Sequence, residues 1–184
     1  DLIFVGRETY AACVAPIAAR WGLPFLLRLP GGTSMGVLQG WYPPALASRV
    51  LEAYGMATAA VSPGRHLADL VRARGIDRVT VIPTAVDIEQ FAPCPKDPAL
   101  LRTLGIPPDA VVVTHVSNLK PVKRPMDLVK SASAAIRRDG RLVYLIVGDG
   151  PLRGEMESAC RDAGIQQRFR FVGWVDHAEI PAYF

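Results

Sequence analysis

The chain has 184 residues, of which 50% are hydrophobic and 21% charged, a composition typical of a globular protein rather than a disordered one. No apolar run is long enough to cross a membrane, and we expect no signal peptide in the first residues. The formal net charge of +4 comes without a set of stacking aromatic residues, which argues against nucleic acid as a partner. Both ends of the sequence lie within apolar patterns, so we expect the chain to be a fragment.

The first half of the sequence alternates predicted strands and helices. Short apolar runs predict strands, and apolar residues spaced three or four apart predict helices. The predicted strands are residues 2–5, 25–29, 57–61 and 78–82, and the predicted helices are residues 9–21, 42–54 and 63–74. Residues 30–36 are expected to form a flexible loop, in which Gly31, Gly32 and Thr33 would let a substrate approach the backbone. A plain turn explains these glycines equally well.

A proline-rich segment separates this half from the second one. Residues 83–108 contain one short helical pattern, near residues 98–104, and otherwise have the composition of a linker. The alternation then restarts, with predicted strands at residues 110–116, 141–147 and 168–172 and helices that begin at Pro125 and Pro151. We therefore predict an α/β protein with two Rossmann-like domains, residues 1–92 and 93–184, each incomplete in this chain.

The central part of the second half carries the strongest functional signal. Residues 110–116 are rich in β-branched side chains and are predicted to form a strand buried on both faces. The order strand, helix, strand implies parallel strands joined by a right-handed crossover. Three loops would then lie at the carboxyl edge of one sheet, where open α/β sheets bind ligands: residues 117–124, 148–150 and 173–177.

The first of these loops favours an anionic ligand. Lys120, Lys123 and Arg124 precede the helix that begins at Pro125, and a helix N-terminus itself attracts negative charge. A phosphate or diphosphate suits this arrangement, and Gly148 and Gly150 would let it approach the next strand end. A solvated basic surface remains the alternative explanation of the charge.

Other classes of site find no support in the sequence. The glycine spacing, Gly148-x-Gly150-x-x-x-Gly154, has no Walker lysine after it and argues against a dinucleotide oxidoreductase and a P-loop phosphatase. The cysteines and histidines show no metal-ligand or redox spacing. From the residues alone, the interpretation ends at a phosphate-bearing ligand held between two α/β domains.

Four segments, in order, resemble the signatures of glycosyltransferase family four. Residues 81–91 (VIPTAVDIEQF) are similar to the interdomain segment V-I-P-N-G-V-D-x-x-x-F, and residues 116–124 (VSNLKPVKR) to the loop V-G-R-L-x-x-x-K-G. Residues 146–151 (IVGDGP) and 170–175 (RFVGWV) match the next two signatures in order and spacing. The resemblance covers nearly the whole chain. It implies a retaining glycosyltransferase of the two-Rossmann GT-B type that uses a nucleotide-sugar without a metal.

The resemblance also implies roles for particular residues. Lys123 stands at the position of the family's diphosphate-binding lysine, and Asn118 replaces the usual arginine, a change that Lys120 would answer. These three residues are the expected catalytic ones. The expected donor-binding residues are Ser117, Arg124, Gly148, Asp149, Gly150, Gly173, Trp174, Val175 and Asp176, of which the last four belong to the loop that reads the nucleobase. The basic loop is similar to that of the bacillithiol-pathway branch, which transfers N-acetylglucosamine to malate.

The resemblance implies a hexosyltransferase with two substrates, a nucleotide-diphosphate sugar, most simply a UDP-sugar, and an unidentified acceptor. Gly31, Gly32 and Thr33 are the residues expected on the acceptor side. No cofactor or metal is expected, and the expected location is the cytoplasm, with attachment to a membrane surface if the acceptor is a lipid. Each half lacks strands and helices needed to cover its sheet, so residues 1–184 alone are expected to be poorly stable and to show weak or no transfer. The family's E-x7-E carboxylates are absent from the chain. The alternative is an α/β module that binds a nucleotide or sugar phosphate without transferring anything.

Overall fold

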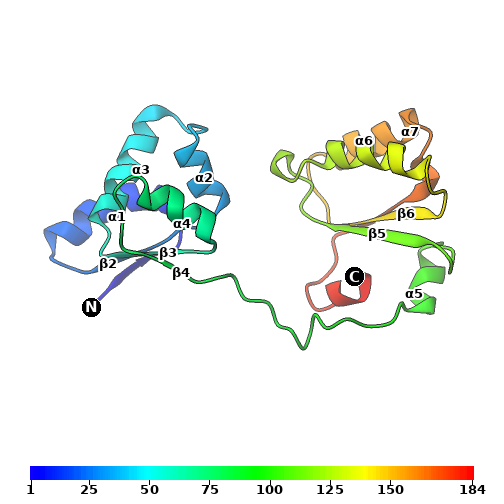
Figure 1. The fold of residues 1–184 in the computed structure, drawn as a ribbon, viewed down its shortest axis with the longest axis horizontal. Coiled ribbons are helices and arrows are strands. Elements are labelled where there is room, and N and C mark those ends of the chain that lie inside the picture. The colour runs from blue at the N-terminus through cyan, green and yellow to red at the C-terminus, as the bar shows by residue number, and fades with distance from the viewer. The chain divides into compact units, whose positions relative to one another are not determined.

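The computed structural model describes residues 1–184, apart from the side chain of Thr33, and divides them into two compact units, Asp1–Val86 and Asp87–Phe184 (Figure 1). Each unit contains one parallel β-sheet and buries its own hydrophobic side chains. The division lies within the proline-rich segment, and the domain boundary expected after residue 92 stays a prediction. No helix in the described part of the chain is long and apolar enough to cross a bilayer.

The first unit has a four-stranded sheet in the order β1-β2-β3-β4, with all strands parallel. Its strands are β1 (Ile3–Val5), β2 (Phe25–Arg28), β3 (Ala59–Ser62) and β4 (Val79–Val81). Its helices are α1 (Glu8–Arg20), α2 (Gly32–Leu38), α3 (Pro44–Met56) and α4 (Arg65–Arg72), and they lie on one side of the sheet (Figure 1). The predicted strands and helices of this half are present, with ends shifted by a few residues.

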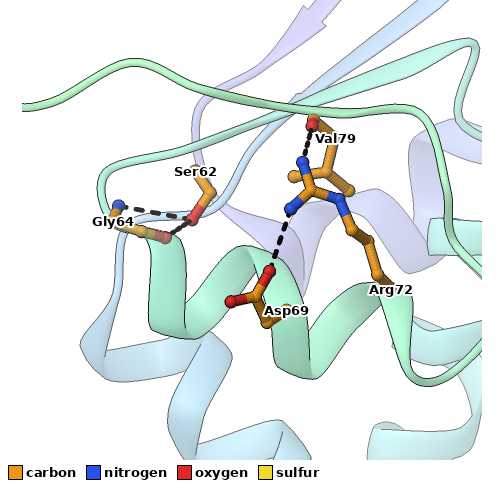
Figure 2. A network of polar contacts seen from close by, with 5 residues as sticks. All are labelled: Ser62, Gly64, Asp69, Arg72 and Val79. Atoms are coloured by element: carbon orange, nitrogen blue, oxygen red, sulfur yellow. Dashed lines mark hydrogen bonds and ion pairs between the residues drawn. The ribbon is translucent and has the colours of Figure 1, made fainter.

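A polar network attaches α4 to the edge of this sheet. Arg72 lies in the last turn of α4 and donates to the carbonyl oxygen of Val79 in β4 at 2.6 Å, while it pairs with Asp69 one turn earlier at 3.0 Å (Figure 2). At the other end of the helix, the Ser62 hydroxyl donates to the carbonyl oxygen of Gly64 at 2.9 Å and closes the turn that leads into α4 (Figure 2). Both ends of this helix are therefore fixed to the strands beside it.

The expectation of a flexible loop at residues 30–36 is wrong, because most of these residues form α2. Gly31 precedes the helix with φ 88°, a positive value that glycine adopts readily. Its carbonyl oxygen accepts from the Met35 amide at 2.8 Å. Ser34 is completely buried and donates to the carboxylate of Glu8 in α1. A glycine-rich segment has little helix propensity of its own, and tertiary contacts of this kind override it.

The second unit has a three-stranded parallel sheet in the order β5-β6-β7, formed by β5 (Val111–Val116), β6 (Leu142–Val147) and β7 (Phe169–Gly173). Helices α6 (Pro125–Ile136) and α7 (Arg153–Asp162) cover one face, and α5 (Pro98–Thr103) and the 3-10 helix η3 (Ile180–Tyr183) cover the other (Figure 1). Two short 3-10 helices, η1 (Pro121–Lys123) and η2 (Gln166–Arg168), precede α6 and β7. The parallel pairing of β5 and β6 confirms the predicted crossover connection.

The prediction that β5 is buried on both faces is wrong. β5 is the edge strand of its sheet, its residues from Val112 to Val116 are half-buried, and Val111 is 41% exposed. The fully buried apolar strand is β6, which lies between the other two and whose residues from Val143 to Val147 are all buried. A uniformly apolar run predicts a strand, but whether that strand is central or at an edge depends on the order of the sheet.

Candidate functional site

The candidate site lies where β5, β6 and β7 end, because hydrogen bonds hold the three strand ends together beyond the sheet. The Ser117 amide donates to the carbonyl oxygen of Val147 at 3.0 Å, and the Gly148 amide donates to that of Gly173 at 2.6 Å. The loops at residues 117–124, 148–150 and 173–177 therefore come together at the carboxyl edge of the sheet, as the sequence predicts.

Two glycines of the second loop are required by the first loop. A Cβ atom at Gly148 would overlap the carbonyl oxygen of Ser117, and one at Gly150 would overlap that of Asn118. Gly148 also has φ 109°, a conformation that other residues rarely adopt. The space that we expected a ligand to use is thus filled by the backbone of residues 117 and 118. The glycines fix the path of the basic loop over the turn beside it.

The basic loop is anchored from within by Leu119. The Leu119 side chain is completely buried among apolar residues of α6, α7 and β6, although its backbone has a left-handed φ of 42°. Its amide donates to Ser117 Oγ at 3.1 Å, and its carbonyl oxygen accepts from the Leu152 amide at 3.3 Å. Arg124, immediately before α6, is the other left-handed residue of the loop, with φ 51°. Both ends of the basic segment are therefore held in uncommon backbone conformations.

The cations of the loop differ in their freedom to bind an anion. Arg124 pairs with Asp127 in the first turn of α6, so part of its charge is already neutralised. Lys120 and Lys123 are both exposed, and neither forms an ion pair with any side chain that the structure describes. These two lysines are the charges of the loop that remain available to a ligand.

His115, at the end of β5, contacts the basic loop and was not predicted to be part of the site. Its Nε2 lies 2.8 Å from Ser117 Oγ, which itself accepts from the Leu119 amide. Burial lowers the pKa of His115, and the nearby positive charge of Lys123 lowers it further, so the ring is neutral near pH 7. A lone histidine in an apolar strand gives no sequence signal for this role.

A cavity of about 230 Å³ opens at this edge of the sheet. It is lined by residues from the ends of β5 and β6, from all three loops and from η3: Val116, Ser117, Asn118, Val147, Gly148, Asp149, Trp174, Val175 and Ile180. Trp174 is 76% exposed beside it, whereas Val175 is buried. Six of the predicted site residues thus share one cavity: Ser117, Asn118, Gly148, Asp149, Trp174 and Val175. Lys120, Lys123, Arg124, Gly150, Gly173 and Asp176 lie in the same loops but do not line it.

Arg153, in the first turn of α7, connects the glycine turn to the end of β7. It pairs with Asp149 at 2.9 Å and with Glu157 at 2.9 Å, and its guanidinium lies 5.9 Å from the centre of the Phe171 ring. A Cβ atom at Gly173 would lie 3.3 Å from this guanidinium. The backbone amide of Gly150 and, next, Arg153 lower the pKa of Asp149. The i, i+4 spacing of these three charged residues was a visible signal that the sequence analysis did not use.

The residues expected on the acceptor side lie in the first unit. Gly31 and Gly32 are at the start of α2 rather than in a loop, and the side chain of Thr33 lies outside the described part of the structure. Beneath α2, Glu8 is completely buried beside Ser34 and Tyr54, and its second oxygen finds no partner among the described atoms. Burial raises the pKa of Glu8, and the hydrogen bond from Ser34 offsets this only in part.

Two further features bear on the choice of site. Within the described residues, no group of three or more His, Cys, Asp or Glu side chains could hold a metal ion. A larger hollow of about 490 Å³ lies in the second unit, but its lining is mainly apolar (Phe91, Ala92, Pro93, Cys94, Pro181 and Phe184) and holds no charged side chain. The smaller cavity at the strand ends is the better candidate for an anionic ligand, because the loop that carries the exposed Lys120 and Lys123 also contributes to its lining.

Comparison with known proteins points to the same region. Residues 97–184 match the family model described as glycosyl transferases group 1. A D-inositol 3-phosphate glycosyltransferase of Actinosynnema mirum is 35% identical over 104 residues, which are 52% of this chain and 25% of that protein. The D-inositol 3-phosphate glycosyltransferase 2 of Catenulispora acidiphila is 28% identical over 182 residues, 90% of this chain and 42% of that protein. The chain thus spans less than half the length of these curated relatives.

The fold is shared with a solved structure that contains a nucleotide. Anabaena Alr3699/HepE in complex with UDP superposes with a TM-score of 0.80 at 21% identity, over 99% of this chain and 50% of that one. The chain therefore has an α/β fold of GT-B type, with two units built on parallel sheets, and its second half is similar to glycosyl transferases group 1.

Proposed function

We propose that the chain is part of a glycosyltransferase that takes a sugar from a nucleotide-diphosphate sugar, and that its second unit binds the donor. The single observation that carries this proposal is the position of Lys120 and Lys123. Both are exposed and without an ion-pair partner in the described structure, on a loop that also lines the cavity at the strand ends. The match of residues 97–184 to a glycosyltransferase family supports it.

The proposed donor is a UDP-sugar. The curated relatives are glycosyltransferases by name, and the HepE structure of similar fold contains UDP. In our proposal Lys123 neutralises the diphosphate, and Lys120 and Asn118 assist it where the family has an arginine. The cavity between Asn118, Asp149 and Trp174 has the size for part of a nucleotide, and the exposed Trp174 with the following Val175 and Asp176 would contact the base. Arg124, which is paired with Asp127, has a smaller role.

The chemistry that we propose is retaining transfer without a metal or cofactor, in the cytoplasm. The lysine charges would replace a metal ion by stabilising the leaving nucleotide diphosphate as the glycosidic bond breaks. The acceptor would bind to the first unit near Gly31 and Gly32, and a lipid acceptor would bring the protein to a membrane surface. The bacillithiol-type loop suggests N-acetylglucosamine as the sugar, and a missing carboxylate pair would leave residues 1–184 without turnover of their own.

Replacing Lys123 by alanine tests the proposal. We expect Lys123→Ala to weaken the binding of UDP to residues 1–184 by about tenfold or more, because a hydrogen bond to a charged group contributes about 1.5–3 kcal/mol. In the longer protein that contains this chain, transfer should fall by about 10²–10³. Isothermal titration calorimetry measures the first effect, and release of UDP from the UDP-sugar measures the second.

Lys130→Ala is the matched control, since Lys130 is also exposed but lies within α6, away from the loop. It should bind UDP as the parent chain does. Equal affinity of the parent and Lys123→Ala for UDP would place the diphosphate elsewhere. Binding that depends on Lys123 without any transfer by the longer protein would instead identify a nucleotide-binding module.

A further inference from the structure

His115 has no role in the function proposed above, yet two successive hydrogen bonds join it to the basic loop. Its Nε2 lies 2.8 Å from Ser117 Oγ, and the same oxygen accepts from the Leu119 amide at 3.1 Å. The three residues therefore connect the end of β5 to the first turn of the basic loop, with Ser117 as the middle member.

The turn that these bonds support is a strained one. Leu119 has φ 42°, in the left-handed region that residues other than glycine seldom occupy, and such a conformation persists only where surrounding contacts impose it. The Leu119 side chain is completely buried, and its backbone amide donates a hydrogen bond to Ser117 Oγ. Both interactions hold the turn in this conformation. Ser117 Oγ can keep this geometry only if its own rotamer is fixed, and the other side chain within hydrogen-bond distance of this oxygen among the described residues is that of His115, at 2.8 Å.

The basic loop depends on this turn for its position. The Lys120 carbonyl oxygen accepts from the Lys123 amide at 2.8 Å, and this bond begins η1. The backbone conformation at Leu119 therefore determines the positions of both lysines. We propose that His115 is a positioning residue, whose ring acts through Ser117 Oγ to hold the left-handed turn at Leu119 and thereby the two lysines that bind the donor diphosphate. The last step rests on the proposed function, whereas the positioning of the turn does not.

The structure supports an indirect role rather than contact with the ligand. His115 is half-buried and, by the alternation of a strand, lies on the same face of β5 as Val113, which packs against the apolar cluster that includes residues of α6. It is not among the residues that line the cavity, whereas Ser117 is. Depending on its tautomer, the neutral ring can accept a hydrogen bond from the Ser117 hydroxyl or donate one to the hydroxyl oxygen. Either arrangement fixes the position of the hydroxyl.

Two readouts on the same variants of residues 1–184 test the proposal. The first is the hydrogen-exchange rate of the Leu119 amide, measured by NMR without any ligand, and the second is the affinity for UDP. We expect His115→Leu to speed exchange of that amide by about fivefold to tenfold and to weaken UDP binding by about threefold to tenfold, since it removes one net hydrogen bond from the chain. His115→Gln, which can hydrogen-bond to Ser117, should restore both values.

Further variants separate positioning from general destabilisation. Ser117→Ala should reproduce the effect of His115→Leu, and the double variant should exchange no faster at Leu119 than Ser117→Ala does, because both act on one chain of bonds. Amides in the middle of α6 should keep the parent rates. His66→Leu, the same change at an exposed histidine of α4, should leave both readouts unchanged.

The outcomes distinguish this inference from the proposed function. Unchanged exchange at Leu119 in His115→Leu would overturn the positioning role. Faster exchange with unchanged UDP affinity would overturn the link from the turn to the ligand. If the parent chain itself binds no UDP while exchange at Leu119 responds as expected, the positioning of the turn stands and the proposed donor site fails.

Discussion

At the scale of single residues, the carboxyl edge of the second sheet is shaped by glycines whose missing side chains make room for protein rather than for ligand. Gly150 is the clearest case, because the carbonyl oxygen of Asn118 occupies the place of its Cβ although its φ is not in the left-handed region. Gly173 combines φ 88° with a guanidinium of Arg153 beside it. Close packing of two backbones therefore explains the glycine at position 150, whereas at position 173 the positive φ and the neighbouring guanidinium explain it.

We expect Gly150→Ala to lower the free energy of unfolding of the second unit by about 1–3 kcal/mol, because an added methyl group must displace the backbone of the basic loop. Urea unfolding followed by tryptophan fluorescence or circular dichroism measures the change. Gly154→Ala is the matched control, since no atom lies within 4 Å of the Cβ position there and the residue is in α7. That variant should be as stable as the parent or slightly more stable. If Gly150→Ala were as stable as the parent chain, the basic loop would be able to move aside at little cost in free energy.

At the scale of elements, α2 is the helix that its own sequence least favours. Its stability comes from contacts with neighbours: Ser34 donates to the buried Glu8 of α1, and Gly36 lies so close to Tyr42 that its Cβ would touch the ring at 2.8 Å. Glu8 and Tyr54 are buried together, and burial raises the pKa of both side chains. A carboxyl group in this environment keeps its proton to higher pH than an exposed one.

This burial makes the stability of the first unit depend on pH. The pKa of Glu8 in the folded chain is raised above the ordinary value of 4.5, so between these two pKa values the folded state binds more protons than the unfolded state. Stability should therefore fall as the pH rises from about 4.5 through the raised pKa. We expect Glu8→Gln, which stays neutral and can still accept from Ser34, to remove this part of the pH dependence. Thermal unfolding midpoints between pH 4.5 and 7.5 provide the measurement.

The comparison isolates Glu8 from the other carboxyl groups. Arg141 lowers the pKa of Asp139 to about 2, so the stabilisation from Asp139 is lost only as the pH falls below the ordinary pKa of 3.8, outside the pH range of the experiment. Glu52→Gln, at an exposed position of α3, should follow the parent curve. Parallel curves for the parent and Glu8→Gln would contradict the prediction.

At the scale of the whole molecule, the chain consists of two units with separate hydrophobic cores. The core of the first unit lies between its sheet and its helices, around Phe25 and Leu27. The second unit has apolar clusters on both faces of its sheet, one around Leu119 and Ile146 and one around Val143 and Leu145. None of these clusters includes residues of both units within the described side chains.

Separate cores predict separate responses to core substitutions. Leu27→Ala should lower the stability of the first unit by about 2–5 kcal/mol, because Leu27 is completely buried there, and should leave the second unit's transition in place. Ile146→Ala should have the opposite pattern. Differential scanning calorimetry of the whole chain would resolve the two effects. A single transition that moves equally with both substitutions would mean that the units unfold as one.

Much of this organisation could be predicted from local sequence patterns. Apolar periodicity predicted β2, β6 and α6 to within a few residues, and the order of strands and helices predicted the parallel sheets. What the sequence could not supply were contacts between distant residues. The bond from Ser34 to Glu8, which accompanies the folding of a glycine-rich stretch into α2, joins residues 26 apart. The edge position of β5 depends on the order of strands in the sheet.

The candidate site shows the same division. Residue types and loop positions were sufficient to predict that residues 117–124, 148–150 and 173–177 meet. They were not sufficient to show that Arg124 is paired with Asp127, or that His115 reaches Ser117, because side-chain partners depend on geometry that no spacing rule contains.

The contact between Gly150 and residue 118 has a consequence for how this loop can vary. It is the carbonyl oxygen of Asn118, common to every amino acid, that fills the space above Gly150, while the Asn118 side chain is exposed. The route of the loop is therefore indifferent to which side chain stands at position 118, but intolerant of any side chain at position 150. The side chain at position 118 can therefore change while main-chain atoms keep the path of the loop the same.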